Sequence, residues 1–175
     1  MSGSEGIALV PEDRRGQGLL LSKSVRENLA LPVIRRFSHF GLLDQRKETE
    51  LVREIMKSLS IKADTPEQIA GTLSGGNQQK VIFGKMLMTQ ARVLLLYDPT
   101  RGVDVGTKGE IFQLMRQLAS EGYAILFYSS DLPELVNVAD RVMVLRSGRV
   151  ARMLEGDDIT EEEILRAAVF DSEAA

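Results

Sequence analysis

The residues with the clearest chemical potential form the run Leu73-Ser74-Gly75-Gly76-Asn77-Gln78-Gln79-Lys80. Ser74 is a preferred residue type for a helix N-cap, and residues 78–88 predict a helix behind it. The Gly75-Gly76 pair carries no side chains, so a ligand can approach the backbone closely. Because the N-terminal end of a helix attracts anions, this arrangement suits a terminal phosphate group. The same residues also fit a plain cap and turn that binds nothing.

A second candidate group is a carboxylate at the end of a predicted strand. The apolar residues 93–96 are followed by Tyr97, Asp98, Pro99 and Thr100. Asp98 could orient a water molecule for hydrolysis, or it could belong only to a turn that ends the strand. The chain contains no Gly-x-x-x-x-Gly-Lys-Ser/Thr run, the loop that would cradle the phosphates of its own nucleotide. We therefore expect half of a nucleotide site.

Both regions resemble one family. Residues 73–80 are similar to the signature motif of ABC transporter ATPases, in the form typical of monosaccharide importers. Residues 93–104 are similar to the family's Walker B strand, catalytic carboxylate and D-loop, which includes Asp104. The resemblance implies that four residues of this chain contact a nucleotide held by the P-loop of a partner subunit, namely Ser74, Gly75, Gly76 and Gln78.

Two positions depart from the family pattern. Tyr97 stands where the family has the aspartate that holds Mg²⁺, and Asp98 stands where it has the catalytic glutamate. A neutral phenol supplies no charged oxygen to Mg²⁺, which prefers hard oxygen ligands in octahedral geometry. Asp98 is one methylene shorter than glutamate, and small displacements of a catalytic group are costly. ATP and Mg²⁺ are implied by the resemblance, but we expect neither cofactor to bind tightly to the isolated chain.

Two further segments match the same family. Residues 7–15 are similar to the segment that holds the Q-loop, with Glu12 where a glutamine commonly contacts the metal. Residues 128–134 are similar to the switch segment, with Ser130 at the position of the switch histidine. Both forms are usual in the second half of tandem sugar-importer ATPases, so we interpret these differences as inherited. The Arg14-Arg15 pair is interpreted as solvated surface, with contact to a phosphate or a partner as the alternative.

Composition narrows the remaining possibilities. The chain has 175 residues, of which 43% are hydrophobic and 27% charged, which indicates one globular domain with room for a subdomain. Lys and Arg number 22 against 25 Asp and Glu, so nucleic acid is not an expected partner. The absence of cysteine excludes disulfides and thiolate metal sites. No signal peptide or apolar run of membrane-spanning length is present, which predicts a cytoplasmic protein.

Apolar runs and amphipathic segments alternate along the chain, which predicts an α/β architecture. We expect buried parallel strands at residues 6–10, 92–97, 123–128 and 141–145. Amphipathic helices are predicted at residues 47–59 and 108–120, the second opened by a capping box, Thr107-x-x-Glu110. Residues 22–69 contain no convincing strand and are interpreted as a helical insertion. The turn 146–149 predicts a hairpin ending near Leu154, followed by a last helix from Thr160 and a frayed tail at 171–175.

The expected fold is a partial P-loop NTPase core of the ABC ATPase type, with a mostly parallel sheet and a helical signature subdomain. Its three parts are the Q-loop strand segment, residues 1–21; the helical subdomain with the signature motif, residues 22–90; and the Walker B, D-loop and switch part with the last helix, residues 91–175. In the family fold the P-loop strand lies between the strands at 123–128 and 141–145. Its absence would leave sheet edges and an apolar face uncovered, so we expect the 141–145 strand to close onto its neighbour, to move, or to pair with a second copy in a homo-oligomer.

The resemblance, which covers residues 4–165, predicts a C-terminal fragment of a sugar ABC transporter ATP-binding protein that is inactive as an ATPase on its own. Its implied partners are a P-loop-bearing ABC ATPase half and membrane permease subunits, at the inner face of the membrane. The alternative is a non-catalytic interaction module that retains the scaffold. Enzyme activity in a complex would separate the two possibilities.

Overall fold

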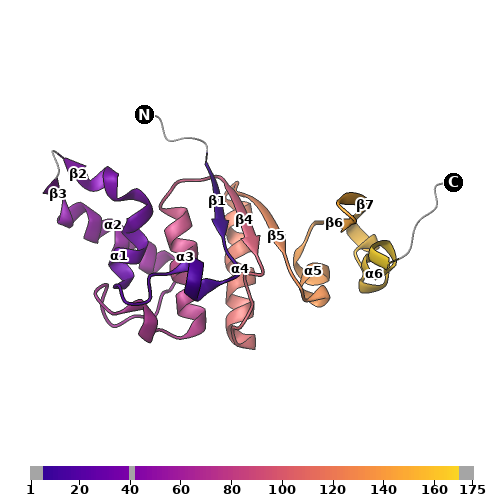
Figure 1. The fold of residues 1–175 in the computed structure, drawn as a ribbon, viewed down its shortest axis with the longest axis horizontal. Helices are drawn as coiled ribbons and strands as arrows, with labels where there is room; N and C mark the ends of the chain where they lie inside the picture. Colours follow the sequence, from indigo (N-terminus) through magenta and orange to yellow (C-terminus); the bar gives the residue numbers. More distant parts are fainter. Residues whose placement is uncertain (1–5, 40–41, 170–175) are drawn as a thin grey trace. The chain divides into compact units, whose positions relative to one another are not determined.

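The computed structural model describes residues 6–39 and 42–169 and divides the chain into two compact units, Met1–Tyr128 and Ser129–Ala175 (Figure 1). The predicted tail at 171–175 lies outside the described residues. The elements of the first unit are, in chain order, β1 (Ile7–Val10), the π-helix η1 (Arg14–Gly18), α1 (Val25–Ala30), the 3₁₀ segment η2 (Leu31–Phe37), β2 (Ser38–His39), β3 (Leu42–Leu43), α2 (Gln45–Ser58), the 3₁₀ turn η3 (Ala70–Thr72), α3 (Gly75–Leu87), β4 (Val93–Tyr97), α4 (Val105–Ser120) and β5 (Ala124–Tyr128).

The centre of the first unit is a three-stranded parallel sheet in the order β1-β4-β5. Three of the predicted strands are confirmed to within a residue at each end, because their apolar runs lack the polar alternation of a half-exposed strand. The long connections from β1 to β4 and from β4 to β5 carry the helices, as parallel strands require. The α/β fold with a parallel sheet is confirmed.

The two faces of this sheet differ in burial. Register pairs Ala8 with Leu94 and Val10 with Leu96, and these four side chains are all buried. The alternate residues of the same strands form the opposite face, where five large side chains are exposed to between 44% and 66%: Ile7, Leu9, Tyr97, Leu126 and Tyr128. The prediction of buried strands is therefore right for one face only. Among the described residues of the first unit, no layer buries the second face.

The helical insertion between β1 and β4 is confirmed in outline. Helix α2 begins two residues before the predicted start, because Asp44 caps it by accepting a hydrogen bond from the backbone N–H of Lys47 at 3.1 Å. The expectation of no strand in this region is wrong for β2 and β3, which form a two-residue antiparallel pair. Such a pair is too short to produce the period-two pattern that sequence analysis depends on.

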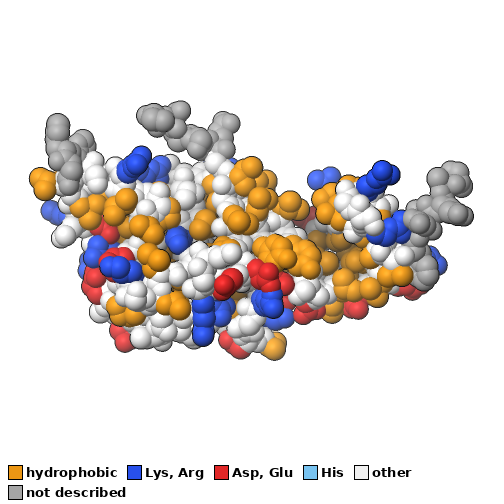
Figure 2. Space-filling model, viewed as in Figure 1, with side chains coloured by type: hydrophobic (Ala, Val, Ile, Leu, Met, Phe, Trp, Pro, Cys, Tyr) orange, Lys and Arg blue, Asp and Glu red, His pale blue; other side chains and the backbone are white. Residues whose placement is uncertain are grey.

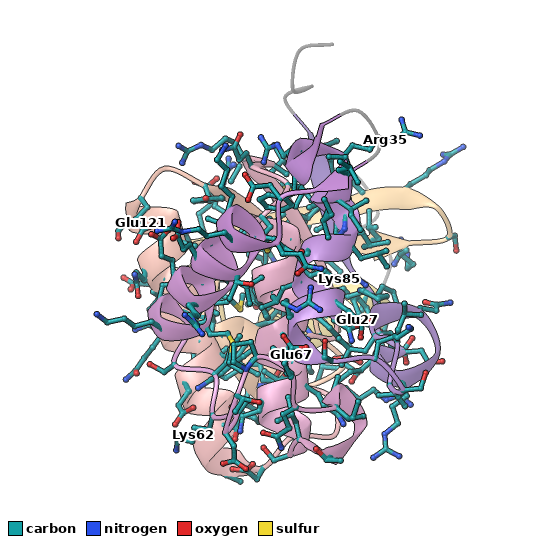
Figure 3. All side chains as sticks on the ribbon, turned by 90° about the vertical axis from the view of Figure 1, so that its left-hand side faces the viewer. Glu27, Arg35, Lys62, Glu67, Lys85 and Glu121 are labelled. Atoms are coloured by element: carbon teal, nitrogen blue, oxygen red, sulfur yellow. The ribbon has the colours of Figure 1, made fainter. Side chains whose placement is uncertain are left out.

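Helix α3 follows the insertion and packs against α1. Val81, Ile82 and Phe83 are completely buried. Lys85, labelled in Figure 3, donates a hydrogen bond to the carbonyl oxygen of Gly18 at 2.7 Å and thus ties α3 to the end of η1. Burial of this ammonium lowers the pKa of Lys85. The signature residues stand at the N-terminal end of this same helix.

The second unit contains α5 (Leu132–Val138), β6 (Arg141–Arg146), β7 (Arg149–Glu155), the 3₁₀ turn η4 (Gly156–Asp158) and α6 (Glu161–Val169). The predicted hairpin is confirmed, and its two turn residues, Ser147 and Gly148, both have positive φ, at 49° and 76°. These angles are typical of a type I′ turn, whose twist suits a two-residue hairpin. The predicted last helix is also confirmed, with Thr160 Oγ1 accepting a hydrogen bond from the N–H of Glu163 at 3.2 Å.

The prediction that residues 141–145 form a buried parallel strand is wrong. Strand β6 pairs antiparallel with β7 and with no other described strand. Its side chains alternate between buried and exposed, so that Val142 and Val144 pack into a small core with Leu154 and α6. The tight turn brings β7 next to β6 locally, and this short-range pairing satisfies the strand without the parallel sheet.

Candidate functional site

The N-terminus of α3 is built by a side-chain cap. Ser74 is exposed, and its Oγ accepts hydrogen bonds from the backbone N–H and from Nδ2 of Asn77, at 3.4 and 3.0 Å. Asn77 in turn accepts a hydrogen bond from the N–H of Lys62 at 2.8 Å, so the capped end is tied to the loop after α2. The predicted N-cap at Ser74 is confirmed. A 13-residue helix therefore presents its positive end beside an exposed hydroxyl group.

The two glycines of the signature segment, residues 73–80, are packed against other parts of the first unit. A Cβ atom on Gly76 would overlap the side chain of Thr107, at 2.7 Å from Oγ1. A Cβ atom on Gly75 would lie 3.2 Å from Nη2 of Arg14 and 3.3 Å from the carbonyl oxygen of Gly102. Packing within the chain therefore disfavours a side chain at Gly76 and leaves little room for one at Gly75, a role that the sequence analysis did not predict.

Gln78 lies inside the chain. It is 2% exposed, and its Nε2 donates hydrogen bonds to the carbonyl oxygens of Ala70 and Leu73, both at 3.2 Å. These bonds hold the turn η3 against the first turns of α3. The side chain that was predicted to contact a nucleotide is therefore directed at the backbone of its own chain.

The N-terminus of α4 lies close to that of α3 through Thr107. Asp104 caps α4: its Oδ1 accepts a hydrogen bond from the N–H of Thr107 at 3.0 Å and its Oδ2 accepts one from the Thr107 hydroxyl at 2.7 Å. The Thr107 hydroxyl, followed by its N–H, lowers the pKa of Asp104. The predicted capping box at Thr107 and Glu110 is wrong, because Asp104 starts the helix three residues earlier.

Glu110 instead pairs with Lys80 of the signature segment, with Oε2 and Nζ 2.7 Å apart. The side chain of Lys80 is 8% exposed, and its Nζ also donates a hydrogen bond to the carbonyl oxygen of Ser60 at 3.2 Å. The hydrogen bond from Lys80 lowers the pKa of Glu110. This pair joins α3 to α4 one helical turn behind their capped ends.

The segment between β1 and η1 approaches the same region. Glu12 forms an ion pair with Arg101, which precedes Gly102. Asp13 caps η1 by accepting hydrogen bonds from the N–H groups of Arg15 and Gly16, at 3.1 and 2.9 Å. These residues line a surface hollow together with Arg14. The interpretation of the Arg14-Arg15 pair as solvated surface is right for Arg15, which is exposed, but wrong for Arg14, whose Nε and Nη1 atoms are buried and have no hydrogen-bond partner among the described residues.

Three of the predicted segments are therefore brought together in the first unit. Arg14 follows Glu12 and contacts Gly75, Gly75 faces Gly102, and Gly76 contacts Thr107. Ser130 belongs to the second unit, where it is exposed, while its neighbour Ser129 donates a 2.7 Å hydrogen bond to the carboxylate of Glu134 at the start of α5.

The end of β4 has a different character. The ring of Tyr97 stacks on that of Tyr128, with centroids 4.9 Å apart and an interplanar angle of 24°. Asp98 is 7% exposed and has a φ of 49°, in the left-handed region, and its N–H donates to the carbonyl oxygen of Tyr128 at 2.9 Å. Figure 2 shows hydrophobic side chains gathered over the part of the chain where Figure 1 draws the sheet.

These residues do not fit a magnesium site. Mg²⁺ binds charged oxygens and water in octahedral geometry, whereas the position next to Asp98 offers a phenol packed on another phenol. Within residues 6–39 and 42–169, no three Asp, Glu or His side chains group closely enough to hold a metal ion. No helix in the same ranges is both long and apolar enough to cross a membrane.

The parallel sheet and the helices packed on it form an α/β fold of the kind found in ABC-type ATPase structures. Residues 2–101 match the sequence profile of the family described as ABC transporter, and the chain belongs to this family. It is 49% identical over 168 residues to the ribose import ATP-binding protein RbsA 1 of Rhizobium etli, and 46% identical over 164 residues to ribose import ATP-binding protein RbsA of Lactococcus lactis subsp. lactis. These matches cover 96% and 94% of this chain but only 33% of each relative.

Solved structures share the fold at low sequence identity. The ATP-binding cassette MJ0796, in a dimeric post-hydrolysis state bound to ADP and phosphate, is similar with a TM-score of 0.70 and 23% identity, over 85% of this chain and 62% of that one. CbiO1 from Clostridium perfringens, part of the ABC transporter complex cbiONQ, is similar with a TM-score of 0.73 and 24% identity, over 93% of this chain and 62% of that one. The chain thus spans about a third of the curated relatives and less than two thirds of these two ATPase structures.

Proposed function

We propose that this chain is the signature-bearing part of a sugar-importing ABC ATPase, and that Ser74 faces the terminal phosphate of an ATP molecule held by the P-loop of a partner. The observation that carries the proposal is the exposed Ser74 hydroxyl at the capped N-terminus of α3. Backbone N–H groups and the helix dipole favour an anion at that position. The family membership and the ribose import relatives support the substrate class.

Within this proposal the other predicted residues have supporting positions. Gly75 and Gly76 keep the helix end close to the turn that precedes α4, and Asp104 holds that turn. Gln78 shapes the loop before α3. Glu12 is expected to act through its ion pair with Arg101 in contacts with a partner subunit. Asp98 and Ser130 remain the residues at the positions of the catalytic carboxylate and the switch histidine.

We propose further that the isolated chain does not hydrolyse ATP. Its sequence has no P-loop motif, and Tyr97 offers no charged oxygen for Mg²⁺. Phosphoryl transfer depends on cradling the phosphates and positioning the metal, and both would have to come from outside these 175 residues. A membrane permease and a P-loop-bearing ATPase half are the partners that this function requires, at the cytoplasmic face of the membrane.

The experiment mixes this chain with the part of the Rhizobium etli relative that the chain does not match, and measures phosphate release from ATP. We expect activity from the mixture, and a loss of at least about tenfold with Ser74→Arg, because a bulky cation at the helix N-terminus blocks an anion. Ser58→Arg is the matched control, since Ser58 is exposed at the end of α2. Equal rates for the wild type and Ser74→Arg would remove the proposal.

A non-catalytic interaction module is the second candidate, favoured by the uncovered face of the sheet. Five large hydrophobic or aromatic side chains are exposed there, which is typical of a surface that a partner covers. A second copy of this chain is the simplest occupant. Association that is unaffected by ATP, together with no phosphate release in the mixture, would favour this candidate.

A further inference from the structure

The position of Arg14 is not explained by the roles described above. Its guanidinium lies beside the backbone of Gly75, as shown by the 3.2 Å separation between Nη2 and a Cβ atom placed on that glycine. A Cβ atom on Gly102 would lie 4.0 Å from the same nitrogen. One side chain from η1 therefore reaches both the signature segment and the turn that precedes α4.

This position is unfavourable for a charged group. Nε and Nη1 of Arg14 are buried without a hydrogen-bond partner among the described residues, and the side chain lies near the positive end of α3. Burial, followed by the nearby charge of Arg15, lowers the pKa of Arg14. The guanidinium gains no ion pair from residues that the structure describes, so within this chain its effect comes from its shape and contacts.

The flat shape of the Arg14 guanidinium suits the narrow space beside Gly75 and Gly102. A guanidinium is flat and rigid, so it can lie against the Cα of a glycine where a longer or rounder group would push the backbone away. Gly75 has the Arg14 guanidinium on one side and the carbonyl oxygen of Gly102 on another, at 3.2 and 3.3 Å from its Cβ position. Gly102 itself has a φ of 67°, which favours glycine. A side chain at Gly75 would therefore have to displace either the Arg14 guanidinium or the backbone at Gly102.

We propose that Arg14 is a positioning residue for the signature segment: its guanidinium sets the spacing between Gly75 and Gly102, and thereby the direction in which Ser74 and the N-terminus of α3 face a bound phosphate. The direction of Ser74 toward a phosphate rests on the proposed function, whereas the spacing between Gly75 and Gly102 does not. Arg14 acts through Gly75 and touches no reacting group. It also connects the hollow beside Glu12 to the capped end of α3.

The first arm of the experiment uses the full 175-residue chain without ligand. Amide ¹H–¹⁵N spectra are compared for the wild type, Arg14→Met, Gly75→Ala and the double variant. We expect Arg14→Met to shift the amide signals of both Gly75 and Gly102. We also expect that Gly75→Ala shifts the Gly102 signal at least about twofold less in the Arg14→Met background than in the wild type, because substitutions at sites in contact are not additive. Arg14→Lys keeps the positive charge but lacks the planar guanidinium, so it should not restore the wild-type signals.

Arg35→Met is the matched control, because Arg35 is exposed on η2 and points away from the body of the first unit (Figure 3). It should leave the Gly75 and Gly102 signals in place. The proposal is wrong if Arg14→Met leaves both signals unchanged, or if the effects of the two substitutions simply add. If Gly75→Ala fails to fold, the comparison of Arg14→Met, Arg14→Lys and Arg35→Met still decides the question.

The second arm measures ATP hydrolysis in the mixture with the unmatched part of the Rhizobium etli relative. Arg14→Met should lower kcat by about tenfold and change KM for ATP by less than about twofold, since the partner binds the nucleotide. If Arg14→Met instead acted through a general loss of folding, both the amount of active complex and the unfolding midpoint would fall. We expect the unfolding midpoint to stay the same or rise, because the substitution removes a buried unpaired charge. An unchanged kcat would contradict the positioning role. A mixture in which even the wild type is inactive would count against the proposed function, while the amide signals would still test Arg14.

Discussion

The two faces of the β1-β4-β5 sheet have similar apolar composition but opposite environments. On one face Ala8, Val10, Leu94 and Leu96 are buried. On the other face Leu9 and Leu126, which both pair with Leu95 of the central strand, are exposed to 54% and 57%. The sequence pattern is the same on both faces, so burial is decided by what packs on each face.

The difference extends to the two candidate sites. The signature segment belongs to α3, whose side chains are in the core, and its glycines contact Arg14, Gly102 and Thr107 within the same unit. Tyr97 belongs to the exposed face and contacts Tyr128. The comparison teaches that the glycines of the signature segment pack within the first unit, whereas the end of β4 leaves an aromatic surface exposed. The following predictions test this difference.

The largest expected effect is the difference in the free energy of unfolding between Leu→Ala substitutions on the two faces of the sheet. Leu94→Ala should lower the free energy of unfolding by about 2–5 kcal/mol, because it leaves a cavity in a completely buried site. Leu126→Ala, on the exposed face, should lower it by less than about 0.5 kcal/mol. Urea unfolding followed by circular dichroism measures both values. Equal costs would mean that the second face is covered in solution.

The next effect concerns the pair that joins α3 to α4. Glu110→Gln should destabilise the chain by about 1–2 kcal/mol, because it leaves the buried ammonium of Lys80 without its carboxylate, and the value is at the low end for such a change since Glu110 is half exposed. Glu50→Gln is the control, because the Arg46–Glu50 pair is exposed and should contribute less than about 0.5 kcal/mol. Chemical unfolding of the two variants side by side measures this contrast, and similar losses would contradict it.

A third prediction asks whether a second copy covers the exposed face. Light scattering of the wild type should show a dimer or a larger oligomer at micromolar concentration, and Leu126→Lys should weaken association by about tenfold, because a charge in the middle of an apolar interface is costly. Leu42→Lys, at an exposed site on β3, should leave association unchanged. A strictly monomeric wild type would argue against a homo-oligomer.

The smallest effect is the acid dependence of the α4 cap. The pKa of Asp104 is lowered in the folded chain, so its contribution to stability is complete above the carboxyl's unfolded pKa and is lost as the pH falls through the folded value, below about pH 4. Asp104→Asn should therefore reduce the slope of unfolding free energy against pH in this acid range and leave it unchanged near neutrality. Parallel slopes for the wild type and the variant would show that the cap does not titrate with folding.

Much of the fold and part of the site were predictable from local sequence. The strands β1, β4 and β5, the N-cap at Ser74 and the hairpin turn at Ser147-Gly148 all follow from residue types that act over a few positions. The start of α4 was misplaced because Asp104 and Thr107 are both good cap residues, and only the hydrogen bonds of Asp104 distinguish them. The interpretation of Arg14 failed because an arginine pair in a polar segment is usually solvated.

What the sequence by itself determined is the strands β1, β4 and β5, the β6–β7 hairpin, the helices α2 and α6, and the presence of a capped helix with the signature residues. Tertiary structure alone decided that β6 pairs with no described strand besides β7, that Gly76 packs on Thr107 and that Arg14 lies against Gly75. The physical reason is range: caps, turns and strand patterns depend on neighbours in the chain, whereas burial and close packing depend on residues that only the fold brings into contact.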